Sequence, residues 1–488
     1  MPEDPNRSTP LNIGWAQADL TPDQPVLIAG QFHARLSEGV DDPITATAAA
    51  FEGESDYVIF VSCDLVTISE ALRKAVRRRV ADSSRELEPE KVVLNATHTH
   101  TGPEVRLPEE GSGHSSRGVG VELDAMPAGK YLDFASERIA GAVLTAWENR
   151  CPGSVAFGLG QAVVGRNRRW VNRSGAARMY GDTNTPEFSH IEGYEDHSVN
   201  LLAAYGEAGE LTGLVVNVPC PSQVSEHRFS LSADYWHETR QELRRRLGEG
   251  LPVLAQCSAA GDQSPHLLFE SRANQRMLDL AGRREREEIA NRIAGAVEDT
   301  LTTIEGTAES YASLEHHLER LELPKTALSE EDVAWAEKEA EKLRATYEQQ
   351  KSELAENPEK RQEKRWYRDI TRSYRRMRWF KGVVERYESQ DTEPTISTEL
   401  HVIRMGPVAF ATNRFEYYVD FGIHIKARSE ALQTFVVQLA GPGTYVPTER
   451  STAAGGYGSI PASNPVGPDG GWQLAWRTVE IIEKMWEE

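Results

Sequence analysis

Residues 91–103 read Lys-Val-Val-Leu-Asn-Ala-Thr-His-Thr-His-Thr-Gly-Pro, and the fold class of the chain can be read from this stretch outward. The apolar run over Lys91–Thr97 predicts a β-strand, and His98 and His100 follow at its carboxyl end. Side chains two positions apart on a strand share a face, so two imidazoles can enter one pocket. This spacing suits a metal ligand plus a base, or two metal ligands; a pair of histidines without function is equally compatible with it.

The same alternation of apolar strands and amphipathic helices extends over roughly the first 320 residues. Strands separated by helices favour an α/β fold. Several connections are too short for helical crossovers, so we expect mixed sheet layers rather than a purely parallel sheet. Further strands are expected at Tyr57–Val66, Gly213–Val218 and Val253–Ser258, and helices at Ser69–Val80, Lys130–Glu148, Ala233–Leu247 and Arg284–Ile304.

Residues 325–390 have a different pattern, with apolar residues at three-and-four spacing on both sides of Asn357-Pro358. This predicts an antiparallel α-helical hairpin that protrudes from the α/β domain and either gates a site or mediates self-association into a homo-oligomer. Strands are expected again at Leu400–Arg404, Val408–Thr412 and Thr434–Leu439. We therefore expect one catalytic domain, residues 1–324 and 391–488, with the hairpin inserted into it.

The two halves of the hairpin carry opposite charge. Residues 329–356 contain nine acidic and four basic residues, whereas residues 359–381 contain ten basic and three acidic ones. A basic run of this kind can bind nucleic acid, but an acidic helix facing a basic one, with the rest solvated, explains it more simply.

Composition limits the classes of function. The 488 residues contain 54 Lys and Arg against 75 Asp and Glu, a net charge of −21, which argues against binding to nucleic acid or to anionic lipid. No apolar run is long enough to span a bilayer, and the first residues do not resemble a signal peptide. Four cysteines form no disulfide framework, so we expect a cytoplasmic protein.

Four more polar segments each follow an expected strand. A cysteine between two prolines suits zinc but is more often an inert buried thiol, and an Asp-x-Ser turn is commonly only a turn. The serine segment also lacks the Gly-x-Ser-x-Gly elbow of the α/β-hydrolases. Taken together, the clusters predict a site, because α/β sheets hold ligands at the carboxyl ends of their strands. The segments are Val218-Pro-Cys220-Pro-Ser-Gln223, Ala259-Ala-Gly-Asp262-Gln-Ser264-Pro-His266, Asn413-Arg-Phe-Glu416-Tyr and Ala440-Gly-Pro-Gly-Thr-Tyr445-Val-Pro-Thr.

In this order, the clusters resemble the catalytic domain of the neutral/alkaline non-lysosomal ceramidases. The family's Thr-His-Thr-His-(Ser/Thr)-Gly-Pro segment matches residues 97–103, and its Gly-Asp-Val-Ser-Pro segment matches residues 261–265. The resemblance covers most of residues 11–310 and 395–460 and leaves the hairpin out. Weaker matches are Phe415-Glu416-Tyr417, Tyr445-Val446-Pro447-Thr448 and Asn167-Arg168-Arg169, with Asn172-Arg173-Ser174 as a second candidate for the last.

The resemblance implies one zinc ion per chain, held by His98, Glu416 and Tyr445. In place of the family's second histidine this chain has Cys220, which is the expected fourth ligand, and a thiolate would make the metal softer and less able to acidify water. His227 or His237 entering the site is the alternative.

The resemblance also implies catalytic roles for four residues. His100 is the expected general base or acid, and Arg168 and Tyr457 are expected to stabilise an oxyanion. Ser264 would be either the nucleophile or a hydrogen-bond donor to the tetrahedral oxygen.

The expected function is therefore zinc-dependent hydrolysis of an amide or related acyl bond. Polar loops beside the motifs, such as residues 166–170 and 225–228, favour a small, water-soluble, hydroxylated or anionic substrate over ceramide. The family's signal peptide and C-terminal β-sandwich domain have no counterpart in the sequence, which fits the expected cytoplasmic location. Two alternatives remain: a metal-dependent lyase or glycoside-cleaving enzyme on a sugar-like substrate, and a non-catalytic metal-binding scaffold.

Overall fold

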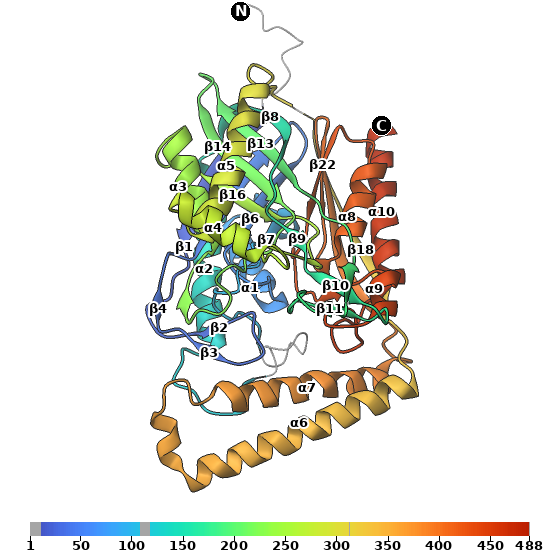
Figure 1. Ribbon diagram of the computed structural model, residues 1–488. Coiled ribbons are helices and arrows are strands. Elements are labelled where there is room, and N and C mark those ends of the chain that lie inside the picture. The colour runs from blue at the N-terminus through green and yellow to red at the C-terminus, as the bar shows by residue number, and fades with distance from the viewer. Residues whose placement is uncertain (1–10, 108–117, 312, 488) are drawn as a thin grey trace, which may run out of the picture.

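Two β-sheets packed face to face form the centre of the molecule (Figure 1). The computed structural model describes residues 11–107, 118–311 and 313–487. The large sheet has the strand order β16 (Val253–Cys257), β14 (Leu211–Val218), β13 (Ser198–Gly206), β8 (Cys151–Gln161), β1 (Leu11–Asp19), β5 (Thr45–Glu52), β6 (Tyr57–Cys63) and β7 (Val92–Ala96). The small sheet has the order β18 (Leu314–Pro324), β19 (Thr395–Met405), β20 (Val408–Thr412) and β22 (Gln433–Val437).

Aromatic side chains fill the space between the sheets. Phe60 of the large sheet lies 4.9 Å from Phe410 of the small sheet, and Phe410 stacks on Phe435 at 4.4 Å, measured between ring centroids. All three side chains are fully buried. A strand that packs on this core with one face and on helices with the other face has no face in solvent. This explains the nearly continuous apolar runs of β6 and β20.

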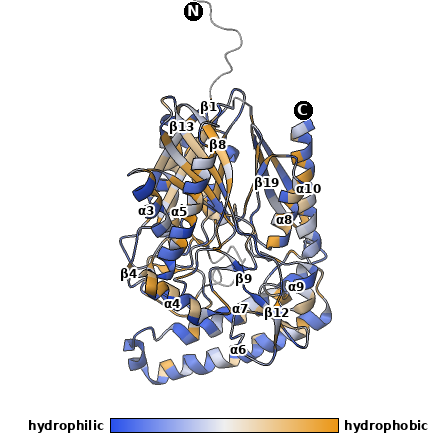
Figure 2. Ribbon diagram, turned by 45° about the horizontal axis from the view of Figure 1, so that its top comes forward, coloured by the Kyte–Doolittle hydropathy of each residue, from blue (hydrophilic) through white to orange (hydrophobic). Residues whose placement is uncertain are grey.

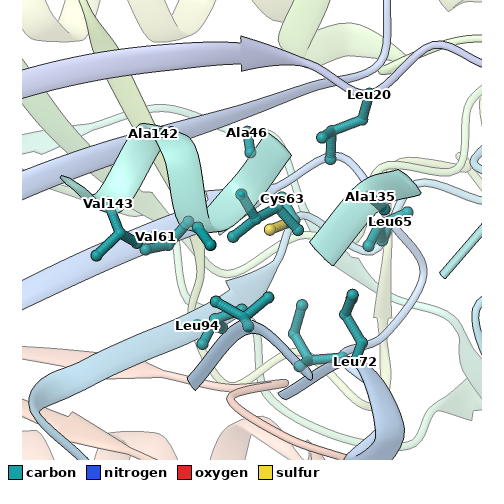
Figure 3. Close-up of a cluster of buried hydrophobic side chains, with 14 of the residues drawn as sticks. Leu20, Ala46, Val61, Cys63, Leu65, Leu72, Leu94, Ala135, Ala142 and Val143 are labelled. Atoms are coloured by element: carbon teal, nitrogen blue, oxygen red, sulfur yellow. The ribbon is translucent and has the colours of Figure 1, made fainter. Parts of the chain in front are cut away.

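Helices cover the outer face of each sheet, giving four layers in the order α, β, β, α (Figure 1). Figure 3 shows part of the packing on the large sheet, where Leu72 and Ala142 of two helices meet Val61 and Leu94 of the strands. None of the described helices is both long enough and apolar enough to cross a bilayer. The large sheet is covered by α1 (Glu70–Ser83), α2 (Ala128–Glu148), α3 (Tyr235–Leu247) and α5 (Glu285–Thr303), and the small sheet by α8 (Val419–Arg428) and α10 (Pro468–Glu487).

The expected mixed α/β fold is confirmed. In the large sheet β6 pairs with β7, and β14 with β16, in the parallel sense, while the other neighbours are antiparallel. The strands and helices expected from the sequence are present, with ends that differ by a few residues. The long antiparallel strands β8, β13 and β18 were not expected. Exposed positions interrupt the apolar pattern of β8 and β18, and glycines interrupt that of β8, whereas β13 is buried over most of its length.

The large sheet curls, so that its two edge strands come together. Strand twist of roughly 20–25° per neighbour accumulates across such a sheet. As a result, Ser62 Oγ of β6 and Asn95 Nδ2 of β7 both donate to the carbonyl of Ala255 in β16, at 2.5 and 3.2 Å. The segments that follow β7 and β16 are therefore neighbours, although the two strands lie at opposite ends of the strand order.

Short elements connect the strands and helices of the two sheets, and several of them lie beyond the carboxyl ends of these strands. Several of them carry the residues singled out in the sequence. They are β2 (Leu27–Ile28), β3 (Arg35–Leu36), β4 (Gly39–Val40), η1 (Pro89–Lys91), β9 (Arg166–Asn167), β10 (Arg169–Asn172), β11 (Ala177–Met179), β12 (Phe188–Ile191), β15 (Ser230–Leu231), β17 (Gln263–Ser264), α4 (Ser271–Ala281), β21 (Glu416–Tyr417), β23 (Tyr445–Val446) and α9 (Glu449–Ala454).

Residues 325–390 contain a helical hairpin of α6 (Glu330–Glu356) and α7 (Arg368–Ser389), joined through η3 (Pro358–Gln362). The expectation that it protrudes is wrong for α7, which lies along the body (Figure 1). Thr371 Oγ1 accepts from the backbone N–H of Ala34 at 2.9 Å, and the Arg375 guanidinium donates to the Gln31 carbonyl at 3.3 Å. Figure 2 shows that α6 is largely hydrophilic along its length. The division into an α/β domain and an insertion stays a prediction.

Candidate active site

Main-chain hydrogen bonds join the loops that follow five strands. After β7, the His100 N–H donates to the Ser222 carbonyl at 3.1 Å in the loop after β14. The Gly261 N–H, after β16, donates to the Tyr417 carbonyl at 2.8 Å, and the Glu416 N–H donates to the Thr444 carbonyl at 3.0 Å. Two of these bonds connect segments more than a hundred residues apart in the sequence, and the Ala96 N–H, which donates to the Leu439 carbonyl at 3.3 Å, joins the two groups, so the five polar clusters form one surface.

His98 is held in one orientation at the centre of this surface. Its backbone has φ +61°, a left-handed conformation that is uncommon for a residue with a side chain. The ring is 5% exposed, and its Nδ1 lies 2.6 Å from the Val66 carbonyl oxygen. A carbonyl only accepts hydrogen bonds, so Nδ1 carries a proton and Nε2 of the neutral ring has a free lone pair.

That lone pair faces other acceptors. His98 Nε2 lies 3.3 Å from Glu416 Oε2 and 3.4 Å from His100 Nε2. A neutral imidazole nitrogen and a carboxylate oxygen repel one another at this distance unless a proton or a metal cation lies between them. The arrangement therefore has the donor chemistry of a metal site, in which a carbonyl orients a histidine ligand from behind.

Strand pairing places Glu416 beside Tyr445, because β21 and β23 pair in parallel with these two residues opposite each other. Burial raises the pKa of Glu416, but a positive charge and a proton at His98, together with the charge of Arg168 and a hydrogen bond from Tyr445, outweigh this effect, so the net pKa is lowered; a metal cation bound at His98 Nε2 would act in the same direction. Burial and the nearby Glu416 carboxylate raise the pKa of Tyr445. Gly261 lets the loop after β16 approach, since a Cβ there would lie 2.3 Å from the Glu416 carbonyl oxygen.

Arg168 brings a buried positive charge to the same point. Its guanidinium donates to the hydroxyls of Tyr180 at 2.6 Å and Tyr445 at 3.1 Å and to the Gly261 carbonyl at 2.8 Å. It also contacts Gln223 Oε1 at 3.3 Å. Burial disfavours the charge, but the tyrosines and Glu416 outweigh burial and raise the pKa of Arg168, so the group stays cationic. Arg173, the second candidate, is exposed on a turn away from this site.

Ser264 lies behind Arg168. It is fully buried on β17, its Oγ accepts from the His266 N–H at 3.0 Å, and it is hydrogen-bonded to Tyr180. Because Tyr180 in turn contacts Arg168, the serine is connected to the guanidinium through one phenol. The structure therefore places Ser264 next to the site, and not among the residues that line its cavity.

His100 is held from its other side. Gly30, with φ +94°, lies against the imidazole, and a Cβ there would come within 2.8 Å of the ring. His100 Nδ1 lies 3.4 Å from Glu226 Oε2, while Glu226 Oε1 lies 3.3 Å from His266 Nε2. One carboxylate therefore lies between the histidine of the first motif and the histidine of the serine motif.

Cys220 does not join the other predicted ligands. Its thiol is fully buried in the apolar cluster under α3 and α5, its Sγ lies 3.5 Å from the Pro221 carbonyl, and burial raises the pKa of the thiol. The two alternative ligands do not join the site either. His227 is exposed, and His237, on α3, lies 4.0 Å from the carboxylate of Asp42. Three residues further along the same loop, the Gln223 side chain contacts Arg168 and Tyr180 instead.

A small cavity of about 40 Å³ lies over these groups. Five of the eight predicted residues line it, while Arg168 contacts the wall from behind. Within the part of the chain that the structure describes, no three His, Cys, Asp or Glu side chains form a metal cluster, so the donor set depends on the phenol of Tyr445. The lining residues are Gly30, Val66, Thr67, His98, His100, Arg106, Glu416, Leu439, Gly443, Tyr445 and Tyr457.

Sequence reasoning missed three residues of the site: Tyr180, Gln223 and Glu226. Gln223 ends the Cys-Pro-Ser-Gln segment, and its place after a strand was the available signal. Glu226 lies in the polar loop 225–228, which the sequence marked only as a loop beside the motifs, and Tyr180, with φ +65° between two short strands, follows no pattern that marks it in the sequence.

No family model matches the sequence, and no curated protein matches it. The structure is similar to two solved structures at 16% sequence identity each. One is the neutral ceramidase from Pseudomonas aeruginosa, with a TM-score of 0.66 over 98% of this chain and 75% of that chain. The other is described as a ceramidase complexed with C2, with a TM-score of 0.67 and the same coverage. The resemblance to the ceramidases is thus confirmed at the level of the fold.

Proposed function

We propose that the protein is a zinc-dependent amidohydrolase that cleaves an amide or related acyl bond in a small polar substrate. The observation that carries this proposal is the meeting of His98, Glu416 and Tyr445 in one buried cavity, with His100 beside them and the charge of Arg168 behind. Two solved structures with this fold bear the name ceramidase, and a ceramidase hydrolyses an amide.

His98 Nε2, the Glu416 carboxylate and the Tyr445 oxygen would hold the zinc ion. Three protein donors with one open position are typical of catalytic zinc, whereas structural zinc is closed by four. When bound, zinc polarises the carbonyl of the scissile bond and lowers the pKa of water. Cys220 as a fourth ligand stays a prediction, although its thiol lies outside the cavity lining.

His100 would move the proton. Its Nε2 faces the cavity, and its Nδ1 faces Glu226, so the imidazole is oriented on both sides. An imidazole in this position can take a proton from the attacking water and deliver it to the leaving amine.

Arg168 and Tyr457 would stabilise the developing oxyanion. Tyr457 lines the cavity and is hydrogen-bonded to Tyr445, and burial raises the pKa of its phenol, so it stays a donor. Donors fixed before the reaction are worth most where water is excluded, as in this buried site. In this arrangement Ser264 acts indirectly. It is hydrogen-bonded to Tyr180, and the Tyr180 hydroxyl accepts a hydrogen bond from Arg168.

A panel of substrates tests the proposal. Short N-acyl amines, esters, aryl glycosides, sugar acids and a fluorescent ceramide in detergent would be assayed with the zinc-supplemented protein. We expect cleavage of a short amide or ester, with kcat/KM above that for ceramide. Glycoside cleavage or elimination from a sugar acid without amide hydrolysis would replace the proposal with a lyase or glycosidase. Bound metal without turnover on any of these would indicate a scaffold.

A further inference from the structure

The helical hairpin forms one wall of a second, larger cavity, which shares Tyr457 with the lining of the small cavity over His98. This outer cavity measures about 750 Å³ and lies between α7 on one side and the segments around Phe32 and Tyr457 on the other. Tyr457 lines both this outer cavity and the small cavity over His98. The two cavities therefore lie on either side of the same phenol, and a ligand that extends from one to the other would contact the hairpin.

Three arginines of α7 line the outer cavity. Arg368, Arg372 and Arg376 are four residues apart, so they lie along one side of the helix. Among the described residues, Arg368 and Arg376 have no ion-pair partner, and Arg372 has only the exposed Asp369 at 3.4 Å. Glu339 of α6 is the one carboxylate among the described lining residues, so the wall keeps an excess of positive charge.

His33, on the opposite side, responds to that charge. Burial, followed by the charges of Arg35, Arg368, Arg372 and Arg375, lowers the pKa of His33 to about 3. The imidazole is therefore neutral at pH 7 and adds a hydrogen-bonding group without opposing a positive neighbour. Burial is the largest cause of this shift, but Arg368 and Arg372 contribute to it and line the same cavity, where their charges would attract an anion.

Aromatic rings make up much of the remaining lining. Phe32 lies 5.1 Å from Trp379 and 6.0 Å from Tyr457, measured between ring centroids. The Arg376 guanidinium lies 5.9 Å from the centroid of Phe32, and Trp335 is 37% exposed. Rings next to guanidinium groups suit a ligand with a flat or apolar body and a carboxylate, phosphate or sulfate group.

We infer that the α7 arginines and the Phe32–Trp379–Tyr457 aromatic cluster form an anion-selective binding site, which holds a negatively charged group of the substrate while its amide reaches His98. That the bound ligand is the substrate rests on the proposed function. That the cavity binds an anionic aromatic molecule does not rest on it. Ceramide carries no such group, so this site would favour acylated anions over ceramide.

Binding to the outer cavity can be measured without turnover. Isothermal calorimetry would compare phenyl phosphate, phenylacetate and benzyl alcohol, which share a ring and differ in charge. We expect both anions to bind at least tenfold more tightly than the alcohol at low salt, with an advantage that shrinks as salt screens the charges. Replacing Arg368, Arg372 and Arg376 together by Gln should remove the advantage. Arg344→Gln, at an exposed position of α6 outside the cavity, is the matched control.

The hydrolysis of two amides then separates this inference from the proposed function. N-butyryl-phenylalanine carries a carboxylate, and N-butyryl-phenylalaninamide does not. We expect the acid to be preferred by the native enzyme and by Arg344→Gln, and the preference to fall about tenfold in the triple variant. Equal binding of anion and alcohol, or anion binding unchanged in a folded triple variant, would overturn the inference. Selective anion binding with neither amide cleaved would support the anion site and contradict the proposed function.

Discussion

The floor and the roof of the candidate active site are built in different ways. The floor consists of the strand-end loops that carry His98, Glu416 and Tyr445, and it is buried and joined by main-chain hydrogen bonds. The roof is the α7 wall with Arg368, Arg372 and Arg376, whose side chains are exposed or half-buried. Fixed groups suit chemistry, because a catalytic group must keep its position, whereas long side chains in solvent suit the capture of varied ligands.

If the proposals above hold, the sheets supply the reaction and the hairpin selects the substrate. The floor belongs to the part of the chain whose motifs resemble the ceramidases in sequence, whereas the hairpin carries none of these motifs, although the structural match covers 98% of the chain. A fold can keep its chemistry and change its substrate if the groups that select the substrate belong to a separate segment. The predictions below test whether floor and roof can be changed independently.

The largest effect is expected from the floor. His98→Ala removes the proposed zinc ligand, whose Nε2 faces Glu416, so we expect zinc binding to be lost. We also expect kcat/KM to fall by about a thousandfold or more, because both the polarisation of the carbonyl and the activation of water would be lost. Metal analysis and kinetics on the same preparation would measure both. His227→Ala, at an exposed histidine, is the control and should change neither. Full zinc content in His98→Ala would place the metal elsewhere.

A smaller loss is expected from Ser264→Ala. The serine is hydrogen-bonded to Tyr180, which orients Arg168, so turnover should fall by about a hundredfold while metal content is unchanged. Tyr180→Phe should give a similar loss, and the double variant should be little worse than either single one, because all three act through the same guanidinium. Additive losses would show that Ser264 acts on the substrate directly, and native turnover would make it only a turn residue.

A change in selectivity, with intact metal binding, is expected from the roof. Replacing residues 325–390 by a short Gly/Ser linker should leave a folded protein with zinc bound. It should lose the roughly tenfold preference for anionic over neutral amides, since the α7 arginines that attract the anion are gone. Circular dichroism, metal analysis and the two butyryl amides would measure this. If the variant is insoluble because α7 contacts such as Thr371–Ala34 are needed for folding, the hairpin is part of the core.

The sequence predicted the floor better than the roof, for physical reasons. A strand with an apolar run ends where polar residues begin, so His98, Glu416 and Tyr445 could each be placed at a strand end from local pattern alone. The prediction that these three residues meet in one cavity came from the resemblance and from the rule that α/β sheets bind ligands at the carboxyl ends of their strands. Cys220 occupies the expected position in the chain, but sequence does not fix which side of a loop a side chain takes, and here the thiol turns into the apolar cluster.

The roof could not be predicted, because its role depends on docking and not on local pattern. The opposite charges of the two helices suggested that they neutralise each other. In the structure Arg368, Arg372 and Arg376 face the body instead, and α7 is fixed there by contacts to residues more than three hundred positions away, such as Thr371 to Ala34. Glu226 and Tyr180 were missed for the same reason: they reach the site through irregular loops.

The smallest effect is expected from Cys220→Ala, and this variant decides how far the floor extends. If three donors hold the metal, removing a thiol outside the cavity lining should leave zinc content and kcat/KM close to native. Its cost should appear in stability, because the deleted sulfur leaves space in the fully buried cluster under α3 and α5, at about 1 kcal/mol. Urea unfolding together with metal analysis separates the two outcomes. Cys220→His should also retain the metal. Loss of zinc from a well-folded Cys220→Ala variant would make the thiol the fourth ligand, and the loop after β14 would then have to turn Cys220 toward His98 when the metal binds.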